Sequence, residues 1–290
     1  MPISIAYLGP AGTYAEAAAL ACAAWLTQTQ GEAPLLIPYP SIFQTLQATA
    51  SHQTQLTVVP VENSIEGSVS ITLDTLWQLD ILRIQQAIVL PISHALLSHA
   101  PSIEAIQSVH SHPQALAQCQ GWLEKHLPTV KLIPTSSTTE ALQHLDQNMS
   151  AGAIASKRAA HLYCLPILAH PINDHPDNCT RFWVMGLQNS ETGNHSSLAF
   201  SLPQNVPGSL VKLLQIFADR NINLSRIESR PTKRSLGEYL FFIDVEASLT
   251  SDAVQSALHE LRAQTETLKI FGTYDIMEAQ PPSQMIDQSN

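Results

Sequence analysis

Short apolar runs and longer helix-forming stretches alternate along residues 3–190. The runs are bounded by Gly, Pro or polar residues, as strands are, whereas the longer stretches tend to begin at a capping Ser or Thr. The predicted strands are 3–8, 35–39, 56–61, 82–90, 92–97, 107–110, 131–134, 152–155 and 182–186, and the predicted helices are 14–26, 41–50, 70–79, 114–126 and 138–145. This alternation predicts an α/β unit of layered sheets and helices.

A different order of elements follows residues 191–196, a polar stretch with a Gly that we interpret as a linker. The predicted strands are 197–202, 222–229, 239–245 and 267–274, and the predicted helices are 207–220 and 251–263. The order βαββαβ is that of a ferredoxin-like unit, over residues 197–275. Residues 276–290 are predicted as a tail, and the polar part from Gln280 to Asn290 is typical of a disordered segment.

The charge of the chain excludes some partners. Its formal net charge is -10 and its pI is about 5.6, which argues against nucleic acid or an anionic membrane. Residues 1–190 contain few basic side chains: Arg83, Lys125, Lys131, Lys157, Arg158 and Arg181. An anionic substrate of this unit would therefore depend largely on backbone N–H groups and hydroxyls.

No pattern in the sequence favours export, a membrane span or a metal site. The N-terminus lacks a basic and an apolar signal region, and no run of about 18 apolar residues occurs, so we expect a cytoplasmic protein. The cysteines are Cys22, Cys119, Cys164 and Cys179, and none form a Cys-x-x-Cys pair. Four histidines are candidate ligands, His94, His99, His110 and His112, but their spacing matches neither a helix-borne nor a ribbon metal site, and a hydrogen-bonded or solvated role is expected for them.

Polar groups gather where predicted strands end. Gly9-Pro10-Ala11-Gly12-Thr13 joins a strand to a helix that Thr13 caps, and such a helix start offers N–H donors to a carboxylate or phosphate. The Gly spacing is not the dinucleotide fingerprint and the P-loop Lys is missing, so we reject a nucleotide site. Residues 60–68 form a second polar cluster, at a strand end where ligands of open α/β sheets bind.

Hydroxyl-bearing turns recur at 111–114, 136–139 and 155–157. They suit an anion held by short neutral donors, although Ser and Thr are also simply good helix N-caps. In the strand start Asn178-Cys179-Thr180-Arg181-Phe182, alternation predicts that Thr180 and Phe182 point into one cavity, with Arg181 on the other face or at the rim. An ordinary strand start of common residues would look much the same.

Together these segments resemble prephenate dehydratase followed by an ACT regulatory domain, over essentially the full length. The matching stretches are Gly9–Tyr14, Val59–Gly67, Ser111–Gln114 with Gln118-Cys119, Asn178–Phe182, Asn205–Leu210 and Glu228–Pro231. Two positions depart from the family pattern: Ala15, where Ser or Thr is frequent, and Ser209, where Ala is common.

The resemblance implies a cleft between two lobes similar to a periplasmic binding protein, with residues 1–75 and 172–190 in one lobe and 76–171 in the other. The reaction would convert prephenate to phenylpyruvate, water and carbon dioxide without cofactor or metal, because aromatisation supplies the driving force. We expect the Thr180 hydroxyl to assist departure of the ring hydroxyl, and Phe182 to form the wall beside the ring.

The resemblance also implies how the dianionic substrate is held. Asn63, Ser64, Ser111 and Gln118 would bind it, with Thr13 at its helix N-terminus. Arg181 would be the main positive charge nearby. Because Glu62 cannot hold an anion when ionised, it would orient a neighbour or bind a hydroxyl.

The ACT unit implies inhibition by phenylalanine and a homodimer or homotetramer in which ACT units pair edge to edge. The effector residues would be Pro207, Gly208, Ser209, Leu210, Asn223, Leu224, Glu228, Ser229, Arg230 and Pro231. Two alternatives stay open at this point. One is arogenate dehydratase, the same chemistry on the aminated side chain, and the other is a non-catalytic binding or sensor protein on the same fold.

Overall fold

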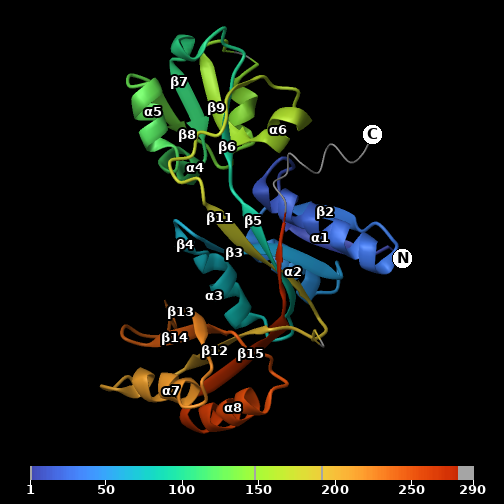
Figure 1. Ribbon diagram of the computed structural model, residues 1–290, viewed down its shortest axis with the longest axis vertical. Helices are drawn as coiled ribbons and strands as arrows, with labels where there is room; N and C mark the ends of the chain where they lie inside the picture. Colours follow the sequence, from blue (N-terminus) through green and yellow to red (C-terminus); the bar gives the residue numbers. More distant parts are fainter. Residues whose placement is uncertain (1, 147, 191, 280–290) are drawn as a thin grey trace.

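The computed structural model describes residues 2–146, 148–190 and 192–279, which form three sheets arranged along one long axis. A seven-stranded sheet lies in the middle, a five-stranded sheet lies at one end and a four-stranded sheet lies at the other (Figure 1). The predicted fold, a two-lobed α/β unit followed by a ferredoxin-like unit, is confirmed. None of the described helices is both long enough and apolar enough to cross a membrane.

The central sheet has the order β16-β5-β11-β3-β1-β2, with β4 paired to β3. Its strands are β1 (Ser4–Leu8), β2 (Leu35–Tyr39), β3 (Leu56–Asn63), β4 (Gly67–Ser68), β5 (Arg83–Pro91), β11 (Cys179–Gly186) and β16 (Ile276–Glu278). Its helices are α1 (Tyr14–Gln30), α2 (Ile42–Ala50) and α3 (Ser70–Gln78). The Ala-rich α1 covers one face, where small side chains such as Ala18 and Ala19 permit close packing.

The five-stranded sheet has the order β10-β6-β9-β7-β8. Its strands are β6 (His94–Leu97), β7 (Ser108–Ser111), β8 (Lys131–Pro134), β9 (Ala151–Ser156) and β10 (Ile167–Ala169). The helices around it are α4 (Pro113–Ala117), α5 (Gln120–His126), α6 (Lys157–Leu162) and the 3₁₀ turns η1 (Ile103–Ala105) and η2 (Glu140–His144). The chain passes between the two sheets twice, from β5 to β6 and from β10 to β11.

Two predicted helices differ in the structure. Residues 114–126 form α4 and α5 rather than one helix, and Gln118 and Cys119 lie in the break. The break has a physical cause, because the Asp174 carboxylate accepts hydrogen bonds of 2.8 Å from the N–H groups of Gly121 and Trp122 and so caps a new helix start. Residues 138–145 form only the short η2.

The four-stranded sheet has the order β13-β14-β12-β15. Its elements are β12 (His195–Ser201), α7 (Ser209–Ala218), β13 (Leu224–Pro231), β14 (Tyr239–Val245), α8 (Asp252–Gln264) and β15 (Thr267–Tyr274). Both helices cover one face, over a core that includes Phe200 and Ile243. The other face packs on the central sheet, where Phe242 and Tyr274 share a buried cluster with Trp183.

The structure corrects two predicted boundaries. We predicted residues 76–171 as the second lobe, but 83–91 form β5, which pairs with β11 in the central sheet before the chain crosses over. We predicted a tail from residue 276, but Ile276–Glu278 form β16, which pairs in parallel with β5. The predicted disordered segment 280–290 lies outside the described residues.

Candidate active site

A cleft of about 1100 Å³ lies between the central sheet and the five-stranded sheet. The central sheet contributes Thr180 at the start of β11 and Asn63 at the end of β3, which are paired neighbours in the sheet. The other side contributes Gln118, from the break between α4 and α5, and His94, from the start of β6. As predicted, strand ends and turns therefore come together at one cleft.

A chain of hydrogen bonds connects these side chains along the wall of the cleft. The Asn63 amide nitrogen lies 2.9 Å from Thr180 Oγ1 and 2.8 Å from Asn178 Oδ1. Asn178 Nδ2 in turn donates to Gln118 Oε1 at 2.9 Å, and His94 Nε2 lies 3.1 Å from the same oxygen. All five side chains are at least nine-tenths buried.

The backbone fixes the direction of this chain. Asn63 Oδ1 accepts the N–H groups of Ile65 and Glu66 at 3.0 Å each, so its amide nitrogen must face Thr180 and Asn178. Asn178 must then present its oxygen to Asn63 and its nitrogen to Gln118, whose oxygen accepts. This leaves the Thr180 O–H and the Gln118 N–H groups with no acceptor among the described residues, so both can donate to a molecule in the cleft.

His94 is neutral at the end of this chain. Burial lowers the pKa of His94 to about 4, despite its contact with Gln118. Since the Gln118 oxygen accepts, Nε2 must carry the ring proton, and Nδ1 faces the Tyr14 hydroxyl at 3.2 Å. The Tyr14 hydroxyl lies 2.7 Å from the Ser93 carbonyl and shares its one proton between that oxygen and Nδ1, which joins α1 to the crossing between the lobes.

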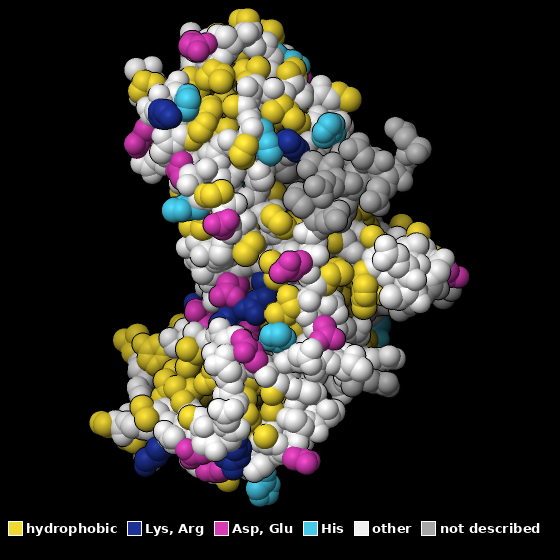
Figure 2. All heavy atoms as spheres, in the orientation of Figure 1, with side chains coloured by type: hydrophobic (Ala, Val, Ile, Leu, Met, Phe, Trp, Pro, Cys, Tyr) yellow, Lys and Arg dark blue, Asp and Glu magenta, His cyan; other side chains and the backbone are white. Residues whose placement is uncertain are grey.

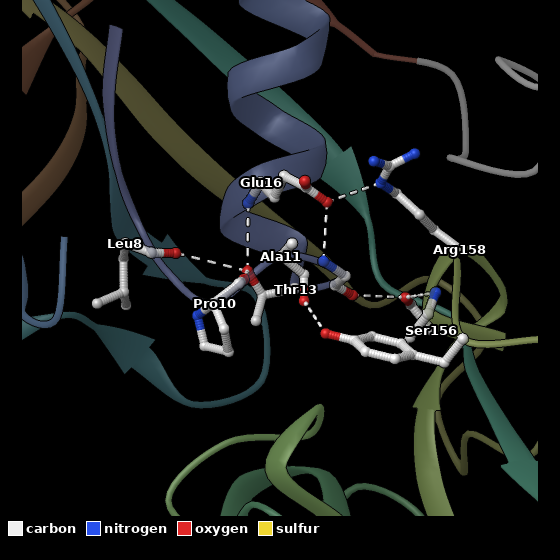
Figure 3. A network of polar contacts seen from close by, with 10 residues as sticks. Leu8, Pro10, Ala11, Thr13, Glu16, Ser156 and Arg158 are labelled. Carbon is white, nitrogen blue, oxygen red and sulfur yellow. Dashed lines mark hydrogen bonds and ion pairs between the residues drawn. The ribbon is translucent and has the colours of Figure 1, made fainter. Parts of the chain in front are cut away.

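The loop at 9–13 lines the cleft, and its hydrogen bonds reach both lobes (Figure 3). Glu16 Oε2 accepts from the Gly12 N–H at 2.8 Å and from Arg158 Nε, in the other lobe, at 2.8 Å. Ser156 Oγ donates to the Gly12 carbonyl at 3.0 Å across the same gap. The Thr13 hydroxyl caps α1 by accepting from the Glu16 N–H, as predicted.

The cleft contains few charges. Of its described lining residues, none is Lys or Arg, and Glu140 is the only acid. An anion bound here would therefore rest on neutral donors such as the Gln118 amide and the free N–H groups at the start of α1. This agrees with the scarcity of basic residues in the first 190 positions.

The predicted site residues divide into three groups. Thr13, Asn63, Gln118 and Thr180 line the cleft. Ser64 and Ser111 do not line the cleft: the exposed Ser64 accepts from the Cys179 N–H at 3.0 Å through its Oγ, and the fully buried Ser111 donates to the Ile154 carbonyl. Phe182, Glu62 and Arg181 form the third group, and none of the three lines the cleft.

Phe182 faces the same side of β11 as Thr180, but only 2% of it is exposed, in the core beneath α1, and it does not line the cleft. Arg181, predicted as the positive charge beside the substrate, points to the opposite face. Its guanidinium pairs there with Glu62 and with Asp244 of β14, so neither charged partner reaches the cleft.

Asn178, His94 and Tyr14 were not predicted as functional residues. Asn178 belongs to the same five-residue segment as Thr180, Asn178–Phe182, so its position beside Thr180 in the sequence is a usable signal. Tyr14 likewise ends the matching stretch Gly9–Tyr14, whereas its contact with His94 joins segments about 80 residues apart and could not be found from sequence spacing.

The predicted effector residues lie on the four-stranded unit. Gly208 caps α7 with φ of 84°, a conformation that favours glycine, and a Cβ there would meet no atom within 4 Å. Asn223 donates to Glu246, and Arg230 binds Asp74 of α3 at 3.1 and 3.2 Å. The Arg230 guanidinium is therefore already engaged with the central unit.

Comparison with protein families identifies the two parts. Residues 5–190 match the family described as prephenate dehydratase, and residues 196–263 match the ACT domain. The chain belongs to the prephenate dehydratase family. These matches give no support to the alternative that the chain is a non-catalytic binding or sensor protein.

Relatives of this dehydratase cover nearly the whole chain. It is 40% identical over 273 residues to the bifunctional chorismate mutase/prephenate dehydratase of Aquifex aeolicus, covering 94% of this chain and 73% of that one. It is 34% identical over 282 residues to the prephenate dehydratase of Lactococcus lactis subsp. cremoris, covering 94% and 98%. The structure of prephenate dehydratase from Arthrobacter aurescens in complex with L-Phe matches with a TM-score of 0.83 and 34% identity, covering 94% and 90%.

Proposed function

We propose that this protein converts prephenate to phenylpyruvate with Thr180 as the hydrogen-bond donor to the departing ring hydroxyl. The bond from the ring to its carboxylate breaks, and its electron pair enters the ring as carbon dioxide leaves. The ring C–O bond breaks at the other end, and the hydroxide gains a proton to leave as water. The gain of aromaticity drives both cleavages. The curated relatives are named for prephenate, which favours it over arogenate.

This assignment rests on one observation. The Thr180 oxygen accepts a hydrogen bond from the Asn63 side-chain N–H, so the Thr180 O–H points away from Asn63 and can donate to another group. A hydroxyl that accepts one hydrogen bond donates a better one, because hydrogen bonds in a chain polarise one another. A positioned donor of this kind contributes roughly 10²–10⁴-fold to rate. The Gln118 amide, free on its nitrogen side, would hold a substrate carboxylate.

Substitution of Thr180 tests the assignment. Thr180→Ala should lower kcat by roughly 10²-fold or more while KM changes little, since the contact matters most in the transition state. Thr180→Ser keeps the hydroxyl and should retain part of kcat. Phenylpyruvate formation by the purified variants measures both, and a near-normal kcat for Thr180→Ala would remove Thr180 from the mechanism.

We propose further that phenylalanine inhibits through the ACT unit and that the protein is a cytoplasmic homodimer or homotetramer. The relative from Arthrobacter aurescens was solved with L-Phe bound. The open space at Gly208 suits the close approach of an amino acid to the start of α7. Strand β13 is an edge strand whose Ile227 is 46% exposed, which suits edge-to-edge pairing. Inhibition assays with phenylalanine and sedimentation of the purified protein test these two points.

A further inference from the structure

The catalytic pair on β3 and β11 has a second pair directly behind it. Thr180 lies opposite Asn63 in the sheet, and Arg181 lies opposite Glu62. Because consecutive side chains of a strand point to opposite faces, the first pair faces the cleft and the second faces away from it. Arg181 and Thr180 are joined by one peptide unit, so the position of one constrains the other.

A carboxylate from the ACT sheet holds Arg181 from behind. Asp244 Oδ2 lies 3.3 Å from Arg181 Nη2, and Asp244 belongs to β14. The Glu62 carboxylate contacts the same nitrogen from the catalytic side. Arg181 is thus the link between a strand of the active site and a strand of the ACT unit.

Asp244 is itself held firmly. It is fully buried, accepts from Arg226 Nε at 2.8 Å and from Nη2 at 3.2 Å, and also accepts from Ser197 Oγ at 2.6 Å. Burial alone would raise the pKa of Asp244, but Arg226 and Arg181 outweigh it and hold the pKa below its usual value. A buried carboxylate that accepts three hydrogen bonds from Arg226 and Ser197 is a fixed point against which Arg181 can be oriented.

The surroundings of this contact are apolar and closely packed. Trp183, two residues after Arg181, lies beneath the Arg226 guanidinium at 5.4 Å and packs edge-on against Tyr274. In Figure 2, Lys or Arg and Asp or Glu side chains gather in the crease between the ACT unit and the central sheet, with hydrophobic side chains around them. The low polarity of such a site strengthens the ion pairs within it.

We infer that Asp244 is a positioning residue for the dehydratase reaction, acting through Arg181 to fix the strand position of Thr180. This inference depends on the role of Thr180 proposed above. Asp244 lies outside the cleft and touches no substrate, so it affects the placement of the hydroxyl rather than the binding of prephenate. The ACT unit then contributes to catalytic geometry even when it carries no effector.

Steady-state kinetics of two variants and their combination test this inference in the full-length protein. Asp244→Asn removes the charge but keeps the shape, and Arg181→Gln cuts the link while Asp244 stays paired with Arg226. A misplacement of about 1 Å can cost on the order of 10²-fold in rate, so each variant should lower kcat by roughly 10- to 100-fold with KM within about twofold. If Asp244 acts through Arg181, the double variant should lose no more kcat than the more impaired single variant.

Lys269→Gln is the matched control, since Lys269 of β15 also crosses from the ACT unit to the catalytic unit, where it pairs with Asp80. It should keep kcat. The inference is overturned if folded Arg181→Gln turns over prephenate at the wild-type rate, if Lys269→Gln loses as much kcat, or if the losses in the double variant multiply. Should Asp244→Asn fail to fold, Arg181→Gln decides alone. The Thr180→Ala variant, assayed in parallel, shows separately whether the proposed role of Thr180 fails.

Discussion

Asn63→Asp is the most informative single substitution in the cleft, because it changes the direction of a hydrogen-bond chain without changing its shape. The introduced carboxylate can still accept from the N–H groups of Ile65 and Glu66. It replaces the amide nitrogen that now donates to Thr180 and Asn178 with an acceptor. Thr180 must then donate to the new carboxylate and loses its free O–H.

The reversal continues along the chain. Asn178 would turn its nitrogen toward the carboxylate and its oxygen toward Gln118, so Gln118 would turn its own nitrogen inward and present its oxygen to the cleft. Loss of the Thr180 donor should lower kcat by roughly 10²–10⁴-fold. Loss of the Gln118 donor to a substrate carboxylate costs about 1.5–3 kcal/mol, or roughly 10- to 150-fold in affinity.

The assay is steady-state formation of phenylpyruvate over a range of pH, corrected for the uncatalysed reaction at each pH. A protonated carboxyl can again donate to Thr180, and burial raises the pKa of a carboxyl, so activity relative to wild type should recover as pH falls from about 7 to about 5. Asn148→Asp is the control, since its Oδ1 also accepts a backbone N–H, from Ser150, outside the cleft. Wild-type kcat in Asn63→Asp, or the same loss in Asn148→Asp, would refute the reasoning.

Two further predictions concern His94 and Glu16. The pKa of His94 is about 4 in the folded protein against an ordinary 6.5, so the unfolded chain binds more protons between these values and stability falls as pH drops through that window. The free energy of unfolding should therefore fall between pH 7 and pH 5 by about 2 kcal/mol less in His94→Gln than in the wild type. Urea unfolding curves of both proteins at the two pH values measure this difference. Glu16→Gln weakens the contact with Arg158 between the lobes and should raise KM by roughly 3- to 10-fold with a smaller effect on kcat, measured in the same turnover assay. An unchanged KM would show that this contact does not hold the cleft closed.

The sequence predicted which face of a strand each residue occupies, because alternation is a local property. Thr180 and Phe182 do share a face of β11, and Arg181 does face the other way. Alternation could not show what covers each face. Phe182 lies under α1 rather than beside the substrate, since that helix packs across the sheet at this depth.

The partner of Arg181 could not be found by the same reasoning. Asp244 lies 63 positions later, in a unit with its own hydrophobic core. The sequence around a single acidic residue in a strand does not predict which other strand that residue contacts. The break at Gln118 is a similar case, because the cap that starts α5 comes from Asp174, more than 50 residues away. Contacts between distant segments determined each of these differences.

Strand β16 has a mechanical consequence. The ACT unit enters from β11 through a short connection and returns to the central sheet through Ile276–Glu278, which pair with β5 beside β11. Because both ends of the ACT unit are joined to strands of the same central sheet, the unit cannot swing outward about one flexible connection. It can move only by small rocking or sliding displacements against the central sheet. Such displacements would be transmitted to β11, the strand that holds Thr180.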